Sequence, residues 1–313
     1  MKEIKFIFDG GLGNQLFQFF ASKYLLLNFK ELKIKYASSN SIRSGYRNLE
    51  INKLIKEPIK VYELHDEIIE KFFSKIIKNL PISNKKLKRK LKSKIYLLNS
   101  TYYEKKEYSD FQDSLSLLKN DLNILKNRYR QLKIKGFWQN PKSYLENFNY
   151  YNNFLIDTKK YIPSGIEPNS YITIHIRRGD YFLKENFRRY LTKFSSIEFI
   201  LLSIQLLPEE NKSKPIYLIS DDQAWVENLI PILSSKSGFK FLSIKTKNNL
   251  EDWSLMRHAS INICANSTFS YTAALLNNEN SGNKLRSIIP QWIQKDVSAY
   301  EKGWLTPKGF LEI

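Results

Sequence analysis

The chain has 313 residues, of which 42% are hydrophobic, and a formal net charge of +19. This length suits two domains of ordinary size or one large one, and no apolar run approaches the ~20 residues that a membrane-spanning helix needs. A single cysteine, Cys264, excludes an internal disulfide framework, and the three histidines show no ligand spacing for zinc. Residues 1–8 are too few and too charged for a signal peptide, so we expect a cytoplasmic protein.

The excess positive charge is concentrated in one run, residues 85–94 (KKLKRKLKSK), which carries seven cations. Three interpretations are open for this run: a solvated helix face, contact with an anionic membrane surface, or nucleic-acid binding. No recognised nucleic-acid-binding motif accompanies it, and aromatic residues are not interleaved with it. We therefore expect no nucleic-acid partner, whereas a peripheral contact with the inner membrane stays compatible with the sequence.

The N-terminal part predicts a strand, a glycine loop and a helix, in that order. Residues 4–8 form a short apolar strand, and the loop sequence DGGLG follows it directly. After the loop, Leu16, Phe20, Tyr24 and Leu27 recur at helical spacing. This is the opening unit of a doubly wound domain, although the dinucleotide-binding fingerprint would need a glycine where Leu16 stands.

The middle of the chain is less regular. A further strand is predicted at 32–36, and residues 134–144 (IKGFWQNPKSY) indicate a strand that passes into a loop and a helix. Residues 60–130 are mostly lysine-rich amphipathic segments and permit no assignment. The stretch 161–170 (YIPSGIEPNS) is rich in Pro, Gly and Ser, which is typical of a linker.

Beyond the linker, strands and helices alternate, as in a parallel sheet with helical crossovers. The expected strands are 171–177, 216–219, 239–244, 261–264 and 286–289, and the expected helices lie near 195–207, 223–233, 250–259 and 268–277. We predict an α/β protein of two Rossmann-like domains, 1–160 and 161–313, whose parallel sheets face a central cleft that holds the ligand.

Two arginines stand at the end of the first strand of the second half, in the sequence YITIHIRRGDY. The three isoleucines of this strand point to one face, and Thr173, His175 and Arg177 point to the other. Gly179 then ends the strand. Arg177 and Arg178 are therefore expected at the carboxyl edge of the sheet, where open α/β sheets bind ligands.

Polar residues also follow two other strands of this sheet, at 220–222 (SDD) and at 266–268 (NST). The Ser/Thr pair precedes a helix, so it either caps the helix or holds a phosphate, and both can be true together. With Arg177 at a neighbouring strand end, an anion site explains the whole set, because an arginine fork matches phosphate oxygens. Asp252, near the start of its helix, is either an acid favoured by the helix dipole or an acceptor for a base ring.

Six blocks of sequence, in order, resemble the α-1,2-fucosyltransferases of glycosyltransferase family 11. They are GGLGNQLFQF, GFWQNPKSY, HIRRGDY, ISDD, LMRHASINICANSTFSYTAALLN and IIPQWI, between Gly10 and Ile293. The resemblance implies a GT-B fold, GDP-fucose as donor, inversion at the sugar, and neither a metal nor another cofactor. One departure is Tyr271-Thr272-Ala273, where the family commonly has paired tryptophans and a glycine, which affects acceptor fit or helix packing.

The resemblance also implies roles for individual residues. Arg177 grips the β-phosphate of the donor with His175 beside it, whereas Arg178 points to the other face and holds the loop. The remaining donor-binding residues implied are Ser267 and Thr268 at the phosphates, Asp252 at guanine, Asn14, Gln15, Gly11 and Gly13 on the fucose and acceptor side, and Asp221 at the ribose. A structural turn at Asp221 and Asp222 is an equal alternative.

An inverting transfer usually recruits one carboxylate as general base. The candidates are Asp9, Asp180 and Glu185. Glu185 is preferred because an acid at a similar distance beyond the same motif is implicated in the related α-1,6-fucosyltransferases, so we take Arg177, His175 and Glu185 as the catalytic set. A reaction without an enzymic base stays open.

The sequence thus predicts an inverting, metal-independent galactoside α-1,2-fucosyltransferase. It would move L-fucose from GDP-fucose to a sugar hydroxyl, the 2-OH of a galactose, in bacterial surface-polysaccharide synthesis. The expected acceptor is a glycan or a lipid-linked saccharide at the cytoplasmic side of the inner membrane. The alternatives are a transferase that uses another GDP-sugar and, in a different class, a basic nucleic-acid-binding protein.

Overall fold

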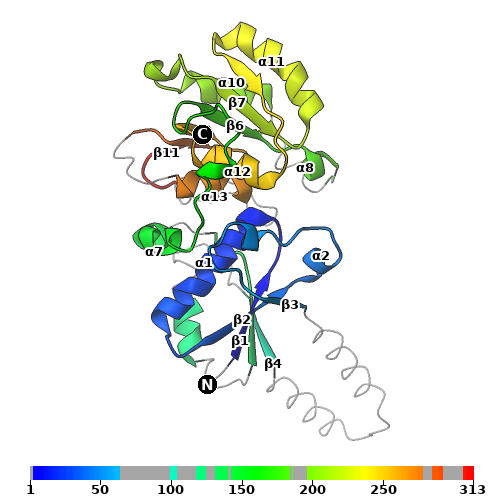
Figure 1. The fold of residues 1–313 in the computed structure, drawn as a ribbon, viewed down its shortest axis with the longest axis vertical. Coiled ribbons are helices and arrows are strands. Elements are labelled where there is room, and N and C mark those ends of the chain that lie inside the picture. The colour runs from blue at the N-terminus through cyan, green and yellow to red at the C-terminus, as the bar shows by residue number, and fades with distance from the viewer. Residues whose placement is uncertain are drawn as a thin grey trace, which may run out of the picture. The chain divides into compact units, whose positions relative to one another are not determined.

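The structure is a computed structural model that places the chain in two compact units, Met1–Phe154 and Leu155–Ile313 (Figure 1). The boundary between them lies a few residues before the expected 160/161 boundary. The structure describes residues 3–63, 99–103, 118–124, 131–139, 142–183, 185, 196–277, 284–291 and 306–313. The basic run 85–94 lies outside these residues.

The N-terminal unit is built on a five-stranded parallel sheet with the strand order β3–β2–β1–β5–β4. Its strands are β1 (Glu3–Phe8), β2 (Lys33–Ser38), β3 (Val61–Glu63), β4 (Asn99–Tyr103) and β5 (Gln131–Lys135). Among the described residues, its helices include α1 (Leu12–Asn28), α2 (Asn40–Arg43), α6 (Lys142–Glu146) and α7 (Phe148–Asn152), residues 118–124 are also helical, and η1 (Ile51–Lys53) is a 3-10 turn. The order places β1 at the centre, so the glycine loop after it lies at the middle of the sheet's carboxyl edge.

Helix α1 is held by aromatic packing rather than by a capping side chain. Its N-cap residue, Gly11, supplies no side-chain hydrogen bond. The ring of Phe20 lies 5.7 Å from that of Tyr144 in α6 and 5.1 Å from that of Tyr151 in α7, and all three residues are buried. Burial of each such ring contributes about 1.5–3 kcal/mol to the stability of the fold, and these contacts hold α1 against α6 and α7.

The C-terminal unit is built on a six-stranded parallel sheet with the order β11–β10–β9–β6–β7–β8. Its strands are β6 (Ile172–Ile176), β7 (Ile216–Ser220), β8 (Phe241–Ser243), β9 (Ile261–Ile263), β10 (Ser287–Ile289) and β11 (Phe310–Glu312). Its helices are α8 (Gly179–Leu183), α10 (Ile197–Gln205), α11 (Gln223–Ser237), α12 (Asn249–Arg257) and α13 (Thr268–Leu276), with 3-10 turns η2 (Lys159–Tyr161) and η4 (Glu209–Asn211).

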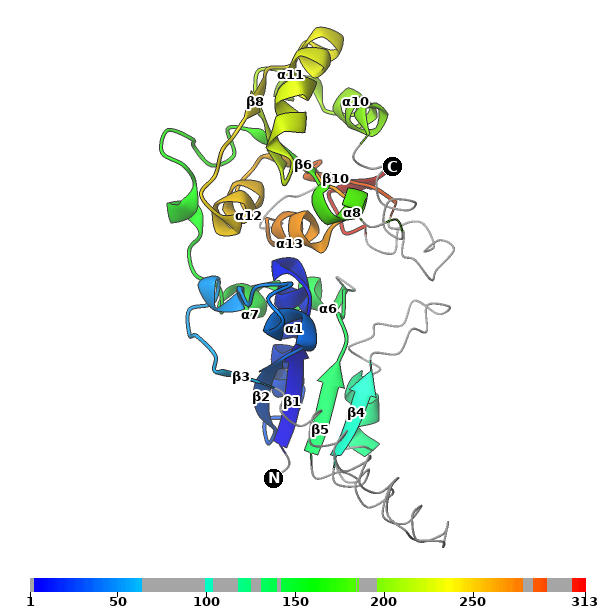
Figure 2. The same cartoon turned by 90° about the vertical axis from the view of Figure 1, so that its right-hand side faces the viewer.

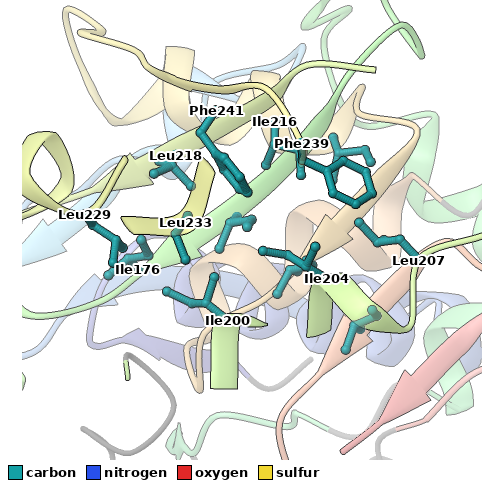
Figure 3. Packing of buried hydrophobic residues seen from close by; sticks show 14 of the residues in the cluster. Ile176, Ile200, Ile204, Leu207, Ile216, Leu218, Leu229, Leu233, Phe239 and Phe241 are labelled. Atoms are coloured by element: carbon teal, nitrogen blue, oxygen red, sulfur yellow. The ribbon is translucent and has the colours of Figure 1, made fainter. Parts of the chain in front are cut away.

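Helices cover both faces of this second sheet: α10 and α11 lie on one side of it, and α12 and α13 lie on the other (Figures 1 and 2). The first face is a continuous apolar core, in which Ile176 of β6 and Leu218 of β7 pack against Ile200 and Ile204 of α10 and Leu229 of α11 (Figure 3). The isoleucines of β6 therefore point into this core, and the alternate residues of the strand point towards α12 and α13.

The strands and helices predicted in the second half are confirmed, with ends that move by a few residues. Helix α11 runs four residues past the predicted end at 233, because the exposed Pro231 is accommodated and Gly238, with a φ of +72°, forms the C-terminal turn instead. Strand β11 was not predicted. Two doubly wound parallel sheets in tandem confirm the predicted α/β, GT-B architecture, whereas the central cleft stays a prediction.

Candidate active site

His175 is a buried histidine on the α12/α13 face of β6. Its side chain is 6% exposed, and its ring lies 5.6 Å from that of Phe269 in the first turn of α13. Burial, together with the charge of Arg177, lowers the pKa of His175 to about 3, so the imidazole is neutral at any working pH. Its Nδ1 atom is buried and has no hydrogen-bond partner among the described residues, which is rare in a folded protein and marks a place that a ligand can complete.

Arg177 directly follows β6, and its guanidinium forms an ion pair with a carboxylate. Its Nη1 lies 2.9 Å from Oδ2 of Asp221, which follows β7. The other oxygen of Asp221 accepts the backbone N–H groups of Arg178 (2.8 Å) and Gly179 (3.0 Å). A Cβ on Gly179 would lie 2.5 Å from Oδ2 of Asp221, so a larger residue there would have to displace the carboxylate that pairs with Arg177. Of the two roles open for Asp221, this geometry favours the structural turn over the ribose contact.

Arg178 lies against α11, in agreement with the position on the other face that the family resemblance implied. Its guanidinium lies between the rings of Phe182 (4.1 Å) and Trp225 (4.2 Å), and its Nε lies 2.9 Å from Oδ2 of Asp222. Asp222 also caps α11, because its Oδ1 accepts from the backbone N–H of Trp225. Arg178 therefore ties the β6–α8 turn to α11.

The N-terminus of α13 lies beside His175. Ser267 is its N-cap residue, and its Oγ accepts from the backbone N–H of Phe269 at 3.4 Å. Thr268, half-buried, begins the helix, and the first turn contains no acidic side chain. The positive end of the helix dipole is therefore not neutralised by its own sequence, so it adds to the positive field of Arg177.

Asp252 lies in the first turn of α12, the helix that packs against α13. It is not needed as a cap, because the side chain of Asn248 accepts from the N–H groups of Leu250 and Glu251. Its Oδ1 accepts instead from Oγ1 of Thr246 at 2.7 Å. Burial raises the pKa of Asp252 from 3.8 to about 6, more than the Thr246 bond lowers it.

The far end of α12 is fixed to neighbouring segments by polar contacts. Nε2 of His258 lies 2.9 Å from Oγ1 of Thr158, and Nη1 of Arg257 donates to the same oxygen at 3.4 Å. The indole N–H of Trp253 donates to Oγ1 of Thr272 at 3.2 Å, so one of the positions that departs from the family pattern joins α12 to α13. These contacts fix the helix that carries Asp252.

In the N-terminal unit, Asn14 lies over the glycine loop. Gly10 has a φ of +76°, and a Cβ added to it would overlap the amide nitrogen of Asn14. The amide of Gln139, just beyond β5, donates to Oδ1 of Asn14 at 3.1 Å. A Cβ added to Gly11 would meet nothing within 4 Å among the described residues, whereas Gly13 is buried in α1.

Gln15 differs from its predicted role on the sugar side, because its side chain is buried and fully hydrogen bonded. Its Nε2 donates to the carbonyls of Gly10 (2.9 Å) and Asn48 (2.7 Å). Its Oε1 accepts from the N–H groups of Glu50 (2.8 Å) and Ile51 (3.1 Å). All four hydrogen-bonding positions of this amide are used, so Gln15 joins two loops and has none left for a ligand.

Gln18 and Asp9 also join segments at this edge of the sheet through hydrogen bonds, a role that the sequence did not indicate for Gln18. Gln18 accepts from the backbone N–H of Asp9 (3.0 Å) and donates to the carbonyl of Gly136 (2.9 Å), which ties the ends of β1 and β5 together. Oδ1 of Asp9 accepts from the N–H of Gly10 and from Oγ of Ser39, each at 2.8 Å. The carboxylate of Asp9 is therefore already hydrogen bonded to the loop residues Gly10 and Ser39.

Two of the three base candidates lie at or beyond α8. Glu185, two residues after Leu183, is exposed and lies in helical conformation rather than in an open loop. Asp180 lies within α8, but its side chain falls outside the described residues. Within the described ranges, no helix has the length and apolar character that a bilayer crossing requires.

The candidate residues thus form one set in each unit. In the C-terminal unit, His175, Arg177 and the N-terminus of α13 come together, with Asp252 on the adjoining helix. In the N-terminal unit, Asn14 and Gly11 lie at the carboxyl edge of β1. Two parallel-sheet α/β units in tandem define the GT-B architecture.

The chain belongs to glycosyl transferase family 11, whose family model matches residues 3–307. It is 25% identical over 283 residues to an α-1,2-colitosyltransferase of Escherichia coli, covering 87% of each chain. It is also 25% identical over 287 residues to the O-antigen biosynthesis glycosyltransferase WbnK of Escherichia coli, covering 86% of this chain and 88% of that one. The structure of POFUT1 in complex with GDP-fucose is 12% identical, with a TM-score of 0.48, over 92% of this chain and 97% of that one.

Proposed function

We propose that this glycosyltransferase moves L-fucose from GDP-fucose to a sugar hydroxyl, the 2-OH of a galactose, with inversion and without a metal ion. The observation that carries the proposal is the buried Nδ1 of His175, which has no partner within the described part of the chain, beside Arg177 and the N-terminus of α13, whose first turn contains no acidic residue. This group of positive and donor-rich elements suits a diphosphate. The resemblance of the motifs and the family to α-1,2-fucosyltransferases supports fucose as the sugar.

In the proposed reaction, Arg177 and α13 stabilise the leaving group. As the bond between the sugar carbon and the phosphate oxygen breaks, negative charge grows on GDP. A guanidinium already held by Asp221 at 2.9 Å needs no reorganisation to meet that charge. Neutral His175 adds a hydrogen bond, since its low pKa excludes a second cation there.

Asp252 is the proposed guanine selector. A carboxylate accepts well from N1–H and N2–H of guanine, which present two donors side by side. Thr246 holds one oxygen of Asp252, and the contacts of α12 with α13 fix the helix that carries it. Adenine and uracil do not present two adjacent hydrogen-bond donors at the same edge. With either base, the part-buried carboxylate of Asp252 would lack a hydrogen-bond partner for part of its charge.

The acceptor hydroxyl attacks from the side opposite the departing phosphate, which inverts the sugar carbon. Glu185, exposed beyond α8, is the proposed general base for its proton. We propose a glycan or lipid-linked saccharide as acceptor, in line with the O-antigen biosynthesis named for one relative. A cytoplasmic enzyme with peripheral contact to anionic membrane through residues 85–94 would meet such an acceptor.

A second candidate is transfer of another GDP-activated deoxy sugar. One relative that matches most of this chain is named a colitosyltransferase, and nothing in the phosphate or guanine contacts distinguishes fucose from colitose. Parallel transfer assays with GDP-fucose and GDP-colitose separate the two. A preference for GDP-colitose of tenfold or more in kcat/KM would move the assignment to the second sugar.

The anion site is tested with matched arginine variants. Arg177→Lys keeps the charge but loses the bidentate fork, so we expect kcat/KM to fall by an amount that corresponds to about 2–4 kcal/mol. Arg178→Lys is the control, because its guanidinium packs between Phe182 and Trp225 and should affect stability more than turnover. Equal kcat/KM for Arg177→Lys and the parent would contradict the proposal.

A further inference from the structure

The segment Gly136–Gln139, the start of the GFWQNPKSY block, has no role in the proposed donor contacts, yet it is hydrogen bonded to the glycine loop. Strand β5, which leads into it, pairs in parallel with β1, which leads into the loop. The two segments therefore leave the sheet side by side. The amide of Gln18 then joins them, since it accepts from the N–H of Asp9 and donates to the carbonyl of Gly136.

The residue before Gln139 anchors this segment in an unusual backbone conformation. Trp138 is fully buried, its ring lies 5.0 Å from that of Phe6, and its φ is +47°. A bulky residue in the left-handed region is strained, and such strain persists only where the surroundings hold it. Here the hydroxyl of Tyr144 donates to the carbonyl of Trp138 at 2.6 Å. The backbone that carries Gln139 is therefore fixed.

From this fixed position, Gln139 sets which way the amide of Asn14 faces. Its Nε2 donates to Oδ1 of Asn14 at 3.1 Å, so the oxygen of Asn14 is engaged. The NH2 group of Asn14 lies next to Gly10 and makes no hydrogen bond among the described residues. Asn14 is half-exposed, so this NH2 group can reach a ligand.

We propose that Gln139 is a positioning residue that presents Asn14 to the substrate as a hydrogen-bond donor. The partner it suits is an oxygen lone pair of the bound activated sugar, on a hydroxyl or on the diphosphate. This inference rests on the proposed function and adds to it the orientation and polarity of one contact in the N-terminal unit. Gln139 acts through Asn14 and does not itself touch the substrate.

The polarity can be inverted by one substitution. In Gln139→Glu the side chain keeps its length but offers only acceptor oxygens, so the NH2 group of Asn14 turns to the carboxylate and its oxygen faces the ligand. We expect kcat/KM for sugar transfer to fall at least tenfold. Gln139→Met removes the hydrogen bond that orients the Asn14 amide but does not favour the opposite orientation, so the loss of kcat/KM should be smaller. The melting temperature of each variant shows how much of the loss is due to folding.

A double-mutant cycle with Asn14→Ala tests whether Gln139 acts through Asn14. We expect Asn14→Ala alone to lower kcat/KM by about tenfold, the effect of one lost hydrogen bond to a charged or strongly polar group. In that background Gln139→Glu should change kcat/KM by less than about twofold. An equal loss from Gln139→Glu in both backgrounds, or an Asn14→Ala variant as active as the parent, would overturn the inference. If the parent itself transfers no GDP-activated sugar, the proposed function fails, and the inference fails with it.

Discussion

Replacing Asp252 with asparagine is expected to make the protein more stable and its binding of GDP weaker. Burial raises the pKa of this carboxyl from 3.8 to about 6. At ~1.36 kcal/mol for each unit of pKa, this rise corresponds to about 3 kcal/mol by which the folded protein disfavours the charged form. Because the side chain is only part-buried, we expect about 1–3 kcal/mol in practice.

The sign of the pH dependence follows from which state binds the proton more tightly. The folded pKa lies above the unfolded one, so stability falls as the pH rises from about 4 to about 6, and the whole penalty is present above pH 6. Asp252→Asn removes it. The free energy of unfolding of the variant should therefore be about 1–3 kcal/mol higher than that of the parent at pH 7.5 and nearly equal to it at pH 4. Buried His175 has the opposite pH dependence, but it contributes equally to the stability of the variant and of the parent. Its effect therefore cancels when the two free energies of unfolding are subtracted.

GDP binding should change in the opposite direction. An amide in place of the carboxylate is a poorer partner for N1–H and N2–H of guanine, which weakens binding by about 1–3 kcal/mol. In the parent, GDP affinity should fall as the pH drops below about 6, because protonation removes the acceptor. Urea unfolding and calorimetric titration with GDP at both pH values measure the two effects. A variant that binds GDP as tightly as the parent would show that Asp252 is not the guanine contact.

Glu251→Gln is the matched control for this experiment. It makes the same charge change one position earlier in the same first turn of α12, so it has the same effect on the helix dipole. Its carboxylate accepts from the backbone N–H of Lys247, a bond that the amide oxygen can keep. We expect its GDP affinity to equal that of the parent. A similar loss in both variants would point to the dipole rather than to a base contact.

Three further predictions concern other parts of the site. Transfer activity should survive EDTA, since Arg177 and the N-terminus of α13 are proposed to carry the phosphate charge, and a strict Mg²⁺ or Mn²⁺ requirement would refute this. Glu185→Gln should cut kcat by about 10²-fold or more while GDP affinity is unchanged; normal turnover would leave the proton to water or another group. Gly11→Ala should leave the melting temperature within a degree or two, because the added Cβ meets nothing within 4 Å among the described residues, and should lower kcat/KM, because the Cβ would occupy space proposed for the substrate. An active Gly11→Ala variant would mean that no substrate approaches there. Gly10→Ala is the contrasting control and should be destabilised, since Gly10 has a positive φ.

The second sheet could be predicted because its strands are short apolar runs between helices of clear period. The alternation of Ile172, Ile174 and Ile176 correctly placed these side chains in the core with α10 and α11, and His175 on the other face, beside α13. Strand β11 could not be predicted in the same way. It is a three-residue edge strand whose pairing with β10 comes from tertiary contact, not from a local pattern.

The loop-holding contacts of Gln15 and Asp221 could not be predicted from the sequence. The sequence alone does not distinguish a helical glutamine that binds a ligand from one that is hydrogen bonded to backbone groups. Gln15 is of the second kind, and three of its partners lie more than 30 positions away in the chain. The same holds for Asp221, whose partners lie about 40 residues earlier in the chain. Such partners become adjacent only because neighbouring parallel strands end at the same edge of the sheet, which a single sequence does not encode locally.

The most direct test of the central claim is a transfer assay with the purified full chain. GDP-fucose, GDP-mannose and UDP-galactose are each offered with a panel of galactosides, and the product linkage is determined by NMR. We expect transfer from GDP-fucose, with inversion, to the 2-OH of a galactose, and no comparable transfer from the uridine donor. Transfer from UDP-galactose but not from any GDP-sugar would contradict the assignment of Asp252, Arg177 and α13 as a site for a guanine nucleotide.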